Sequence, residues 1–307
     1  MVTQAHSPLR RPSVAVLGPG GIGGLFAALL ARRGNRVTCI ARPSTAESLV
    51  EHGLKLTSPA LGDAVVAVEA TTRLEAPVDI VMVTVKATQL EQAMEAIPSE
   101  RLGGALLVPF LNGIDHIAWL RERYPLEQVV AGTIRVESTR IGPGVIEHSS
   151  PFAVVELAAG TADRARVDEL GACLAETGLD VTVREDQAVT LWSKLSVLAP
   201  IALATTWAAA PFGEARARHW DEIQAIVHEI VEAAGADGVD LDEAATISIL
   251  EGVPEGMRSS MQKDAAAGRP IELDAIGGSI LRAAGRGGVQ VPATARLVSD
   301  LERLTVT

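Results

Sequence analysis

The stretch Val14-Ala15-Val16-Leu17-Gly18-Pro19-Gly20-Gly21-Ile22-Gly23-Gly24 sets the architecture of this chain. An apolar run leads into a Gly-x-Gly-x-x-Gly turn, and a helical pattern follows from Leu25 to Arg33 and stops at Gly34. Strand, glycine turn and helix in this order are the context that the dinucleotide-binding fingerprint requires. A glycine-rich turn without a ligand is the alternative, but a second strand pattern from Arg36 to Ile40 disfavours it. We therefore expect a Rossmann-type dinucleotide-binding domain.

Each residue of the turn has an expected part in binding. Gly18 allows the tight turn, Gly20 lets the backbone approach a pyrophosphate, and Gly23 lets the helix pack closely on the strand. The phosphates are expected at the free N–H groups and the positive dipole end of the helix, which begins with Gly21 and Ile22. The cofactor-binding main chain therefore runs from Gly18 to Gly23.

The end of the second strand indicates which dinucleotide is bound. Folds that prefer NAD carry an acidic residue about 20 residues past the glycines, where it binds the ribose 2′-hydroxyl. Here no Asp or Glu stands at that strand end, and Arg42 does, followed by Pro43 and Ser44. A guanidinium suits the 2′-phosphate of NADP. A solvated loop arginine is the alternative, but we expect NADP (NADPH) as the cofactor.

Composition limits the class of protein. The 307 residues suffice for two domains, and the net charge of −11 argues against nucleic acid or an anionic membrane as a partner. Cys39 and Cys173 have no neighbours at metal-ligand spacing, so we expect reduced thiols and no metal site. The polar start, residues 1–12, lacks the apolar core of a signal peptide, and the apolar run 197–212 is interrupted by Pro200. We expect a cytoplasmic protein.

Two later strands are expected to deliver polar side chains to the ligand-binding edge of the sheet. The run 78–86 is typical of a central parallel strand and ends at Lys86, and the run 105–111 ends just before Asn112. Ligands of open α/β sheets bind outside the carboxyl ends of the strands. Either residue could instead be an ordinary loop residue, but two neighbouring strand ends carrying polar groups favour a site.

The rest of the first half is rich in strand patterns, and the second half in helical ones. The strands at 54–57 and 64–69 resemble a hairpin, and four further strands are expected to close the sheet with antiparallel or mixed pairing: 129–139, 144–148, 152–157 and 180–183. Strand patterns stop near Asp186. We expect an α/β Rossmann NADP-binding domain over residues 1–185 and an all-helical substrate or dimerisation domain over 186–307.

The helical half contains a lysine in an unusual place. Residues 187–206 read as a long apolar helix that carries Lys194. The chain has 23 Arg and only four Lys, so arginine supplies most of its generic positive charge. Lysine can release a proton, whereas arginine effectively never does. This favours chemistry at Lys86 or Lys194, although an ammonium that reaches the surface from an apolar helix is the alternative.

A motif near the end of the chain carries acidic residues. The segment Ser259-Ser260-Met261-Gln262-Lys263-Asp264 continues as a helix to about Ala267 and ends at Gly268. A second helix is expected after Pro270, with Glu272 near its N-terminal end. Favourable interaction with the helix dipole is the alternative explanation for that charge.

Together these motifs resemble the ketopantoate reductase (2-dehydropantoate 2-reductase) family. The resemblance covers the chain from Val14 to about Leu304 and rests on the glycine turn, Arg42, Val85-Lys86-Ala87, Asn112-Gly113, Trp192-x-Lys194-Leu195 and the segment 259–274. It implies a Rossmann domain, an all-helical domain and an active site between them. It also implies NADPH-dependent reduction of a 2-oxo acid, with 2-dehydropantoate, reduced to pantoate in pantothenate biosynthesis, as the default substrate.

The resemblance also implies residue roles. Lys194 matches the general acid that protonates the carbonyl oxygen, Glu272 matches the glutamate beside it, and Ser260 matches the serine that contacts the substrate carboxylate. A positioned ammonium can stabilise the alkoxide that hydride transfer creates and supply its proton. Further residues match groups near the cofactor or the substrate: Lys86, Asn112, Glu272 and, at the 2′-phosphate, Arg42.

One departure from the family leaves alternatives open. Family members usually carry two asparagines that hold the ketopantoate hydroxyl, four and eight residues past the lysine, where this chain has Leu198 and Ala202. Loss of buried hydrogen-bonding groups removes discrimination for a hydroxyl. The alternatives are a relative that reduces a different carbonyl or imine compound and a non-catalytic NADP-binding sensor. The Ala-rich helical domain could form a homodimer.

Overall fold

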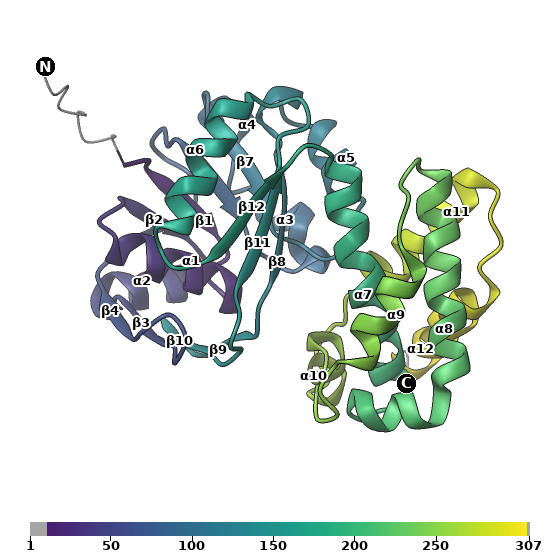
Figure 1. Cartoon of the computed structure of the whole chain (residues 1–307). Coiled ribbons are helices and arrows are strands. Elements are labelled where there is room, and N and C mark those ends of the chain that lie inside the picture. The colour runs from purple at the N-terminus through teal and green to yellow at the C-terminus, as the bar shows by residue number, and fades with distance from the viewer. Residues whose placement is uncertain (1–10, 306–307) are drawn as a thin grey trace, which may run out of the picture. The chain divides into compact units, whose positions relative to one another are not determined.

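The computed structural model describes residues 11 to 305. The contacts divide the chain into two compact units (Figure 1). The first contains the described residues up to Val85, then Leu90–Phe110 and Arg121–Arg184. The second contains two short segments, Lys86–Gln89 and Leu111–Leu120, and the described residues from Glu185 onward.

The first unit is built on a parallel sheet. Its strand order is β5-β2-β1-β6-β7, and all four pairings are parallel. The strands are β1 (Val14–Leu17), β2 (Val37–Ile40), β5 (Glu69–Thr71), β6 (Ile80–Val83) and β7 (Leu106–Pro109). Helix α1 (Gly21–Arg32) connects β1 to β2, and its residues from Gly23 to Leu30 are buried. This is the Rossmann-type arrangement that the glycine turn predicts.

Two further sheets complete this unit. One has the order β4-β3-β10-β9 and the other β12-β11-β8. The strands are β3 (Leu54–Thr57), β4 (Ala64–Val66), β9 (Ser138–Gly142), β10 (Val145–His148), β8 (Ala131–Arg135), β11 (Val154–Ala158) and β12 (Asp180–Arg184). The antiparallel pairing β3–β4 confirms the predicted hairpin, and β9 and β10 also pair in the antiparallel sense.

The prediction that these strands close the main sheet is wrong. Among the described residues, a single isolated bridge, Leu107 to Val129, connects the main sheet with the segment before β8. The run predicted as one strand from 129 to 139 is interrupted after Arg135. There the Glu137 N–H donates to the Ser150 hydroxyl, and the Ser149 N–H donates to the Glu137 carbonyl. These bonds divert the chain into β9.

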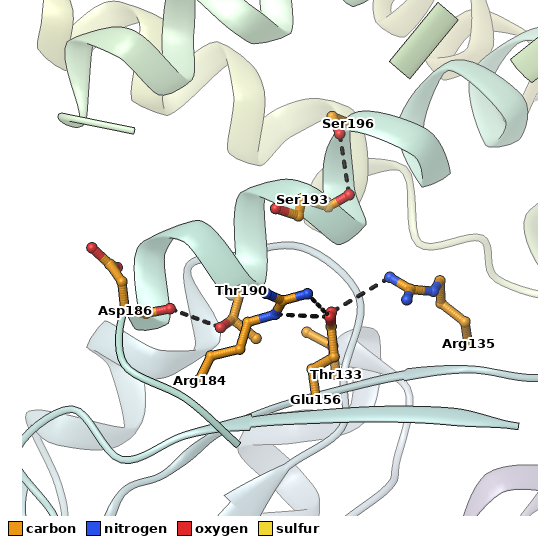
Figure 2. A network of polar contacts seen from close by, with 8 residues as sticks. All are labelled: Thr133, Arg135, Glu156, Arg184, Asp186, Thr190, Ser193 and Ser196. Atoms are coloured by element: carbon orange, nitrogen blue, oxygen red, sulfur yellow. Dashed lines mark hydrogen bonds and ion pairs between the residues drawn. The ribbon is translucent and has the colours of Figure 1, made fainter. Parts of the chain in front are cut away.

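An ion-pair cluster around one buried carboxylate holds the three-stranded sheet together (Figure 2). Glu156 on β11 is 3% exposed. It accepts from Arg184 Nε on β12 at 2.8 Å and pairs with Arg135 Nη1 on β8 at 3.4 Å. Thr133 Oγ1, also on β8, donates to the same carboxylate at 3.5 Å. One carboxylate therefore joins all three strands, with two cations to offset its charge.

Shorter helices connect these strands along the chain. They are α2 (Pro43–His52), η1 (Ala87–Gln89), α3 (Leu90–Met94), α4 (Ser99–Leu102), α5 (His116–Arg121), η2 (Leu126–Gln128) and α6 (Arg164–Ala175). Helix α6 begins at an aspartate cap, because Asp163 accepts from the Ala165 N–H.

The second unit is helical after Glu185, as predicted. Its helices are α7 (Gln187–Trp207), α8 (Phe212–Ala236), α9 (Glu243–Glu251), α10 (Ser260–Ala266), the π-helix η3 (Asp274–Gly278), α11 (Ser279–Gly287) and α12 (Pro292–Thr305). Helix α8 kinks at His219, whose ring contacts Trp207 edge-on.

Helix α7 is the core of this unit. It packs against α8, α9, α10, α12 and η3, and Asp186 caps its start. Within residues 11 to 305 it is the one helix long and apolar enough to cross a membrane, but 72% of its apolar window is buried inside the protein. Its apolar face is thus already covered by protein, which also positions the polar residues that α7 carries.

Candidate functional site

The glycine turn of the first unit has the geometry that a dinucleotide needs. Gly18 adopts a φ of +83°, which disfavours any residue with a side chain. A Cβ on Gly23 would lie 2.4 Å from the Gly18 carbonyl oxygen, so only glycine lets α1 start this close to β1. A Cβ on Gly20 would approach nothing nearer than 3.9 Å, so that side of the turn is open.

The start of α1 fits a phosphate group. No side chain caps this helix, so the first-turn N–H groups, including those of Gly21 and Ile22, lack a side-chain acceptor. No acidic residue lies in its first turn. An open turn and uncapped amides are the features by which such helices bind pyrophosphates.

Arg42 lies two residues after β2 and occupies the N-cap position of α2. Its side chain is exposed, and it forms no ion pair with any described residue. This arginine is therefore free to bind an anion at the carboxyl end of the sheet.

Lys194 is held in the interior of the second unit rather than at the surface. It is 9% exposed, and its Nζ donates to the carbonyl oxygen of Leu111 at 3.3 Å. The alternative of an ammonium reaching solvent is therefore excluded. The residue after Leu111 is Asn112, and its side chain contacts Glu272.

Glu272 is the carboxylate that the side chain of Asn112 contacts. It is 6% exposed. Asn112 Nδ2 donates to its Oε2 at 3.0 Å, and the Ala87 N–H donates to its Oε1 at 2.9 Å. Both of these donors are neutral. The carboxylate is thus hydrogen-bonded while its charge is left available to a cation or a reacting group.

Lys86 has a partner that the sequence did not predict. Its Nζ lies 2.5 Å from Asp264 Oδ2, and Arg269 Nε donates to Asp264 Oδ1 at 2.9 Å. Asp264 stands in the motif that follows Ser260, but nothing in the local sequence showed that its partner lies 178 positions earlier in the chain. Lys86 is thus paired with Asp264, and the next residue, Ala87, donates its N–H to Glu272.

The two serines of the motif differ. Ser259 caps α10 by accepting from the Gln262 N–H, and its hydroxyl also bonds Thr205. Ser260 is exposed, and its hydroxyl forms no hydrogen bond with a described residue. Ser259 is thus structural, whereas the Ser260 hydroxyl is available to a ligand.

The segments carrying Asn112 and Glu272 are fastened together. A Cβ on Gly113 would lie 2.0 Å from the Ala275 carbonyl oxygen, so only glycine permits this contact. Arg282 bridges the same segments, from Asp115 Oδ2 at 2.8 Å to Asp274 Oδ1 at 2.6 Å. The regular helix expected near Glu272 is a π-helix here, and π-helical turns occur frequently at functional sites.

A buried histidine near Lys194 escaped the sequence analysis. His116 on α5 is 6% exposed, and neither ring nitrogen has a hydrogen-bond partner among residues 11 to 305. Burial, and secondarily the charge of Lys194, lowers the pKa of His116 to about 3. The ring is therefore neutral near pH 7. In the described part of the chain no three His, Cys, Asp or Glu residues gather as a metal site.

Comparisons with known proteins identify the family of the chain. The model of the ketopantoate reductase PanE/ApbA family matches residues 14–159, and that of its C-terminal domain matches 187–304. A 2-dehydropantoate 2-reductase of Halobacterium salinarum is 29% identical, with 95% of this chain and 98% of that protein covered.

Solved structures share the fold. A 2-dehydropantoate 2-reductase from Geobacter metallireducens is 26% identical with a TM-score of 0.87, covering 95% of this chain and 99% of that one. A D-mandelate dehydrogenase solved with NADH and anilino(oxo)acetate is 24% identical, also with a TM-score of 0.87 and 95% and 98% coverage, which shows the fold alone. With both family models matched in order, the chain belongs to the ketopantoate reductase family of oxidoreductases.

Proposed function

We propose that this protein reduces a 2-oxo acid to a 2-hydroxy acid with NADPH, and that 2-dehydropantoate, reduced to pantoate in pantothenate biosynthesis, is its substrate. The observation that carries the proposal is the junction at Leu111 and Asn112. One residue binds Lys194 and the next binds Glu272. A cation and an anion, both buried, are thus held at one short segment.

The proposed chemistry assigns a task to each residue. A bound NADPH would supply the hydride that reduces the carbonyl carbon, and the carbonyl oxygen would then take up negative charge. The ammonium of Lys194 stabilises that charge and donates its proton to the oxygen, which leaves a hydroxyl group. Glu272, held by neutral donors, orients the ammonium. Ser260 and Lys86 lie on segments adjoining this cluster and are proposed to bind the substrate carboxylate and the cofactor side.

The cofactor assignment rests on the first unit. The turn from Gly18 to Gly23 fits a pyrophosphate, and the unpaired Arg42 at the end of β2 suits a 2′-phosphate. Asn112 and Glu272 are proposed to lie near the nicotinamide. NADPH is therefore proposed over NADH, and binding titrations with both cofactors test this preference.

A second candidate substrate class comes from α7. Leu198 and Ala202 stand one and two turns after Lys194, on the same side of the helix, and Ala202 is fully buried. An apolar surface there offers no hydrogen bond to a substrate hydroxyl. A 2-oxo acid with a plain or larger apolar side chain is the proposed alternative.

The experiment compares these substrates directly. NADPH consumption is followed with 2-dehydropantoate and with 2-oxoisovalerate, and NADH replaces NADPH as the cofactor control. Efficient turnover of 2-dehydropantoate supports the first proposal, and turnover of hydroxyl-free acids alone supports the second. Tight NADPH binding without turnover of any 2-oxo acid contradicts both.

The proposal also includes the setting of the reaction. A cytoplasmic protein without a nucleic-acid or membrane partner is supported by the net charge of −11. A homodimer formed through the helical unit is part of the same proposal, and sedimentation of the purified protein tests it.

A further inference from the structure

Two arginines, Arg42 and Arg73, lie at the same edge of the parallel sheet. Strands β2 and β5 pair in register, with Ile40 opposite Thr71, and the Ala41 N–H donates to the Thr71 carbonyl at 3.0 Å. Arg42 and Arg73 each stand two residues beyond these partners. Since neighbouring strands lie about 4.8 Å apart, the two side chains start close together at the carboxyl edge.

Neither arginine has an anionic partner. Both side chains are exposed, and neither forms an ion pair with a described residue. Carboxylates are abundant, since the chain has 38 acidic against 27 basic residues. Glu47 and Glu51 even line the groove beside Thr72, yet neither pairs with an arginine there. Two like charges left together and unpaired are unfavourable unless an anion joins them.

The start of α2 adds a third feature at this place. The helix begins at Pro43 directly after Arg42, has no side-chain cap and carries no acidic residue in its first turn. The exposed Ser44 lies in that turn. Pro43 has no N–H, and the Thr45 N–H already donates to the Arg42 carbonyl. The N–H and hydroxyl of Ser44, together with the Arg42 guanidinium, are left to suit a phosphate group.

We propose that Arg73 is a second arginine for the 2′-phosphate of the dinucleotide and contributes to the preference for NADPH over NADH. The inference rests on the proposed NADPH-dependent function and adds a residue that the local sequence does not single out. A phosphate monoester carries between one and two negative charges near pH 7, so a second guanidinium adds to its binding. NADH has a hydroxyl at that position and gains nothing from it.

The test measures binding rather than turnover. Dissociation constants for NADPH, NADH, 2′,5′-ADP and 5′-AMP are determined by calorimetry for the wild type and for Arg73→Gln, Arg42→Gln and Arg33→Gln. Arg33 is the matched control, because it is exposed and unpaired but precedes β2 at the opposite end of the strand.

Arg73→Gln is expected to weaken NADPH and 2′,5′-ADP by about tenfold, the size of one charge-assisted hydrogen bond, and to leave NADH and 5′-AMP within about twofold. Arg73→Lys restores part of the affinity, because it restores charge without the planar fork. Arg42→Gln has a larger effect and Arg33→Gln none. Thermal unfolding confirms that each variant is folded.

The outcomes separate the two proposals. NADPH affinity that depends on Arg42 but is unchanged in Arg73→Gln overturns the inference and leaves the proposed function standing. If Arg73→Gln weakens the binding of NADPH and NADH equally, the inference is overturned as well, because the residue then does not contact the 2′-phosphate. A wild type that binds no NADPH overturns both.

Discussion

Two buried carboxylates, one in each unit, are held in opposite ways. Glu156 in the three-stranded sheet is bound by two arginines and a threonine. Glu272 in the helical unit accepts hydrogen bonds from a side-chain amide and a backbone N–H of residues 11 to 305. Cations neutralise the first charge and tie it to the sheet, whereas neutral donors fix the second without neutralising it. We infer that the first arrangement serves stability and propose that the second leaves a charge for chemistry.

Two buried histidines show the same contrast. His148 on β10 contacts the Ser58 hydroxyl at 2.8 Å and the Ser150 hydroxyl at 3.1 Å through its two ring nitrogens. His116, near Lys194, has neither nitrogen paired among the described residues. Buried polar groups are normally satisfied, so unsatisfied ones mark places where stability has been given up. The contrast therefore supports our proposal that the site lies in the Lys194 region.

The largest expected effect follows from removing the ammonium. Lys194→Met is expected to lower kcat by about 10²- to 10⁴-fold, the usual contribution of a general acid. Stability should change little, because methionine fills a similar volume without a buried charge. Turnover with NADPH and thermal unfolding check this, with Lys263→Met on the exposed side of α10 as the control. A kcat within a few-fold of wild type contradicts the assignment.

Glu156→Ala is expected to act on folding alone. Removing it leaves two half-exposed arginines without their carboxylate, so the free energy of unfolding should fall by about 2–3 kcal/mol. Denaturant titration measures this, and Glu147→Ala on the exposed side of β10 should cost less than about 0.5 kcal/mol. Loss of kcat in a folded Glu156→Ala enzyme would remove the contrast between the two acids.

His116 is expected to make the protein sensitive to acid. Its pKa in the folded state, about 3, is below the ordinary 6.5, so only the unfolded chain takes up the proton as the pH falls. The stability is complete above pH 6.5 and is lost towards pH 3. Between pH 7 and pH 5 the loss is about 2 kcal/mol. His116→Leu should lack this loss in denaturant titrations at the two pH values.

The exposed His228 supplies a control of opposite sign. Its hydrogen bond and ion pair with Glu243 raise its pKa, so its contribution is present at low pH and is lost as the pH rises through the raised value. His228→Gln should therefore be slightly less stable at pH 5 and unchanged at pH 8. If His116→Leu loses stability on acidification as steeply as wild type, burial of this ring is not the cause.

The smallest effect concerns the amide that holds Glu272. Asn112→Ala is expected to lower kcat by about tenfold, because one hydrogen bond to a charged group is lost while the Ala87 N–H remains. When Glu272 is already replaced by Gln, Asn112→Ala should lower kcat by a smaller factor, since the hydrogen bond between the two side chains then joins neutral groups. Full additivity of the two substitutions in steady-state kinetics would show that the residues act separately.

Local signals explain how much of this molecule the sequence predicts. Strand β1, the glycine turn and α1 follow from hydrophobic pattern and turn chemistry within one short stretch, and the helical second half follows from its periodicity. The antiparallel and mixed pairing of the later strands was predicted correctly, but their closure of the main sheet was predicted wrongly. The bonds of Glu137 to Ser149 and Ser150 that divert the chain leave no pattern in the run 129–139 itself.

The site shows the same limit. Lys194 and Glu272 could be singled out by residue type and by family resemblance. The link between Asn112 and Glu272 spans 160 positions, and the one between Lys86 and Asp264 spans 178. Only the register of β2 and β5 shows that Arg73 follows its strand at the position equivalent to Arg42. Contacts of this kind depend on the fold and leave no local pattern.

The most direct test compares the two acids by one substitution. Glu272→Gln and Glu156→Gln each remove a single charge from a buried carboxylate, and kcat with NADPH and 2-dehydropantoate is measured for both. We predict that Glu272→Gln lowers kcat by at least about 10²-fold with little loss of stability, whereas Glu156→Gln keeps kcat and unfolds more readily. Equal kcat values for the two variants would contradict the assignment of Glu272 to the active site.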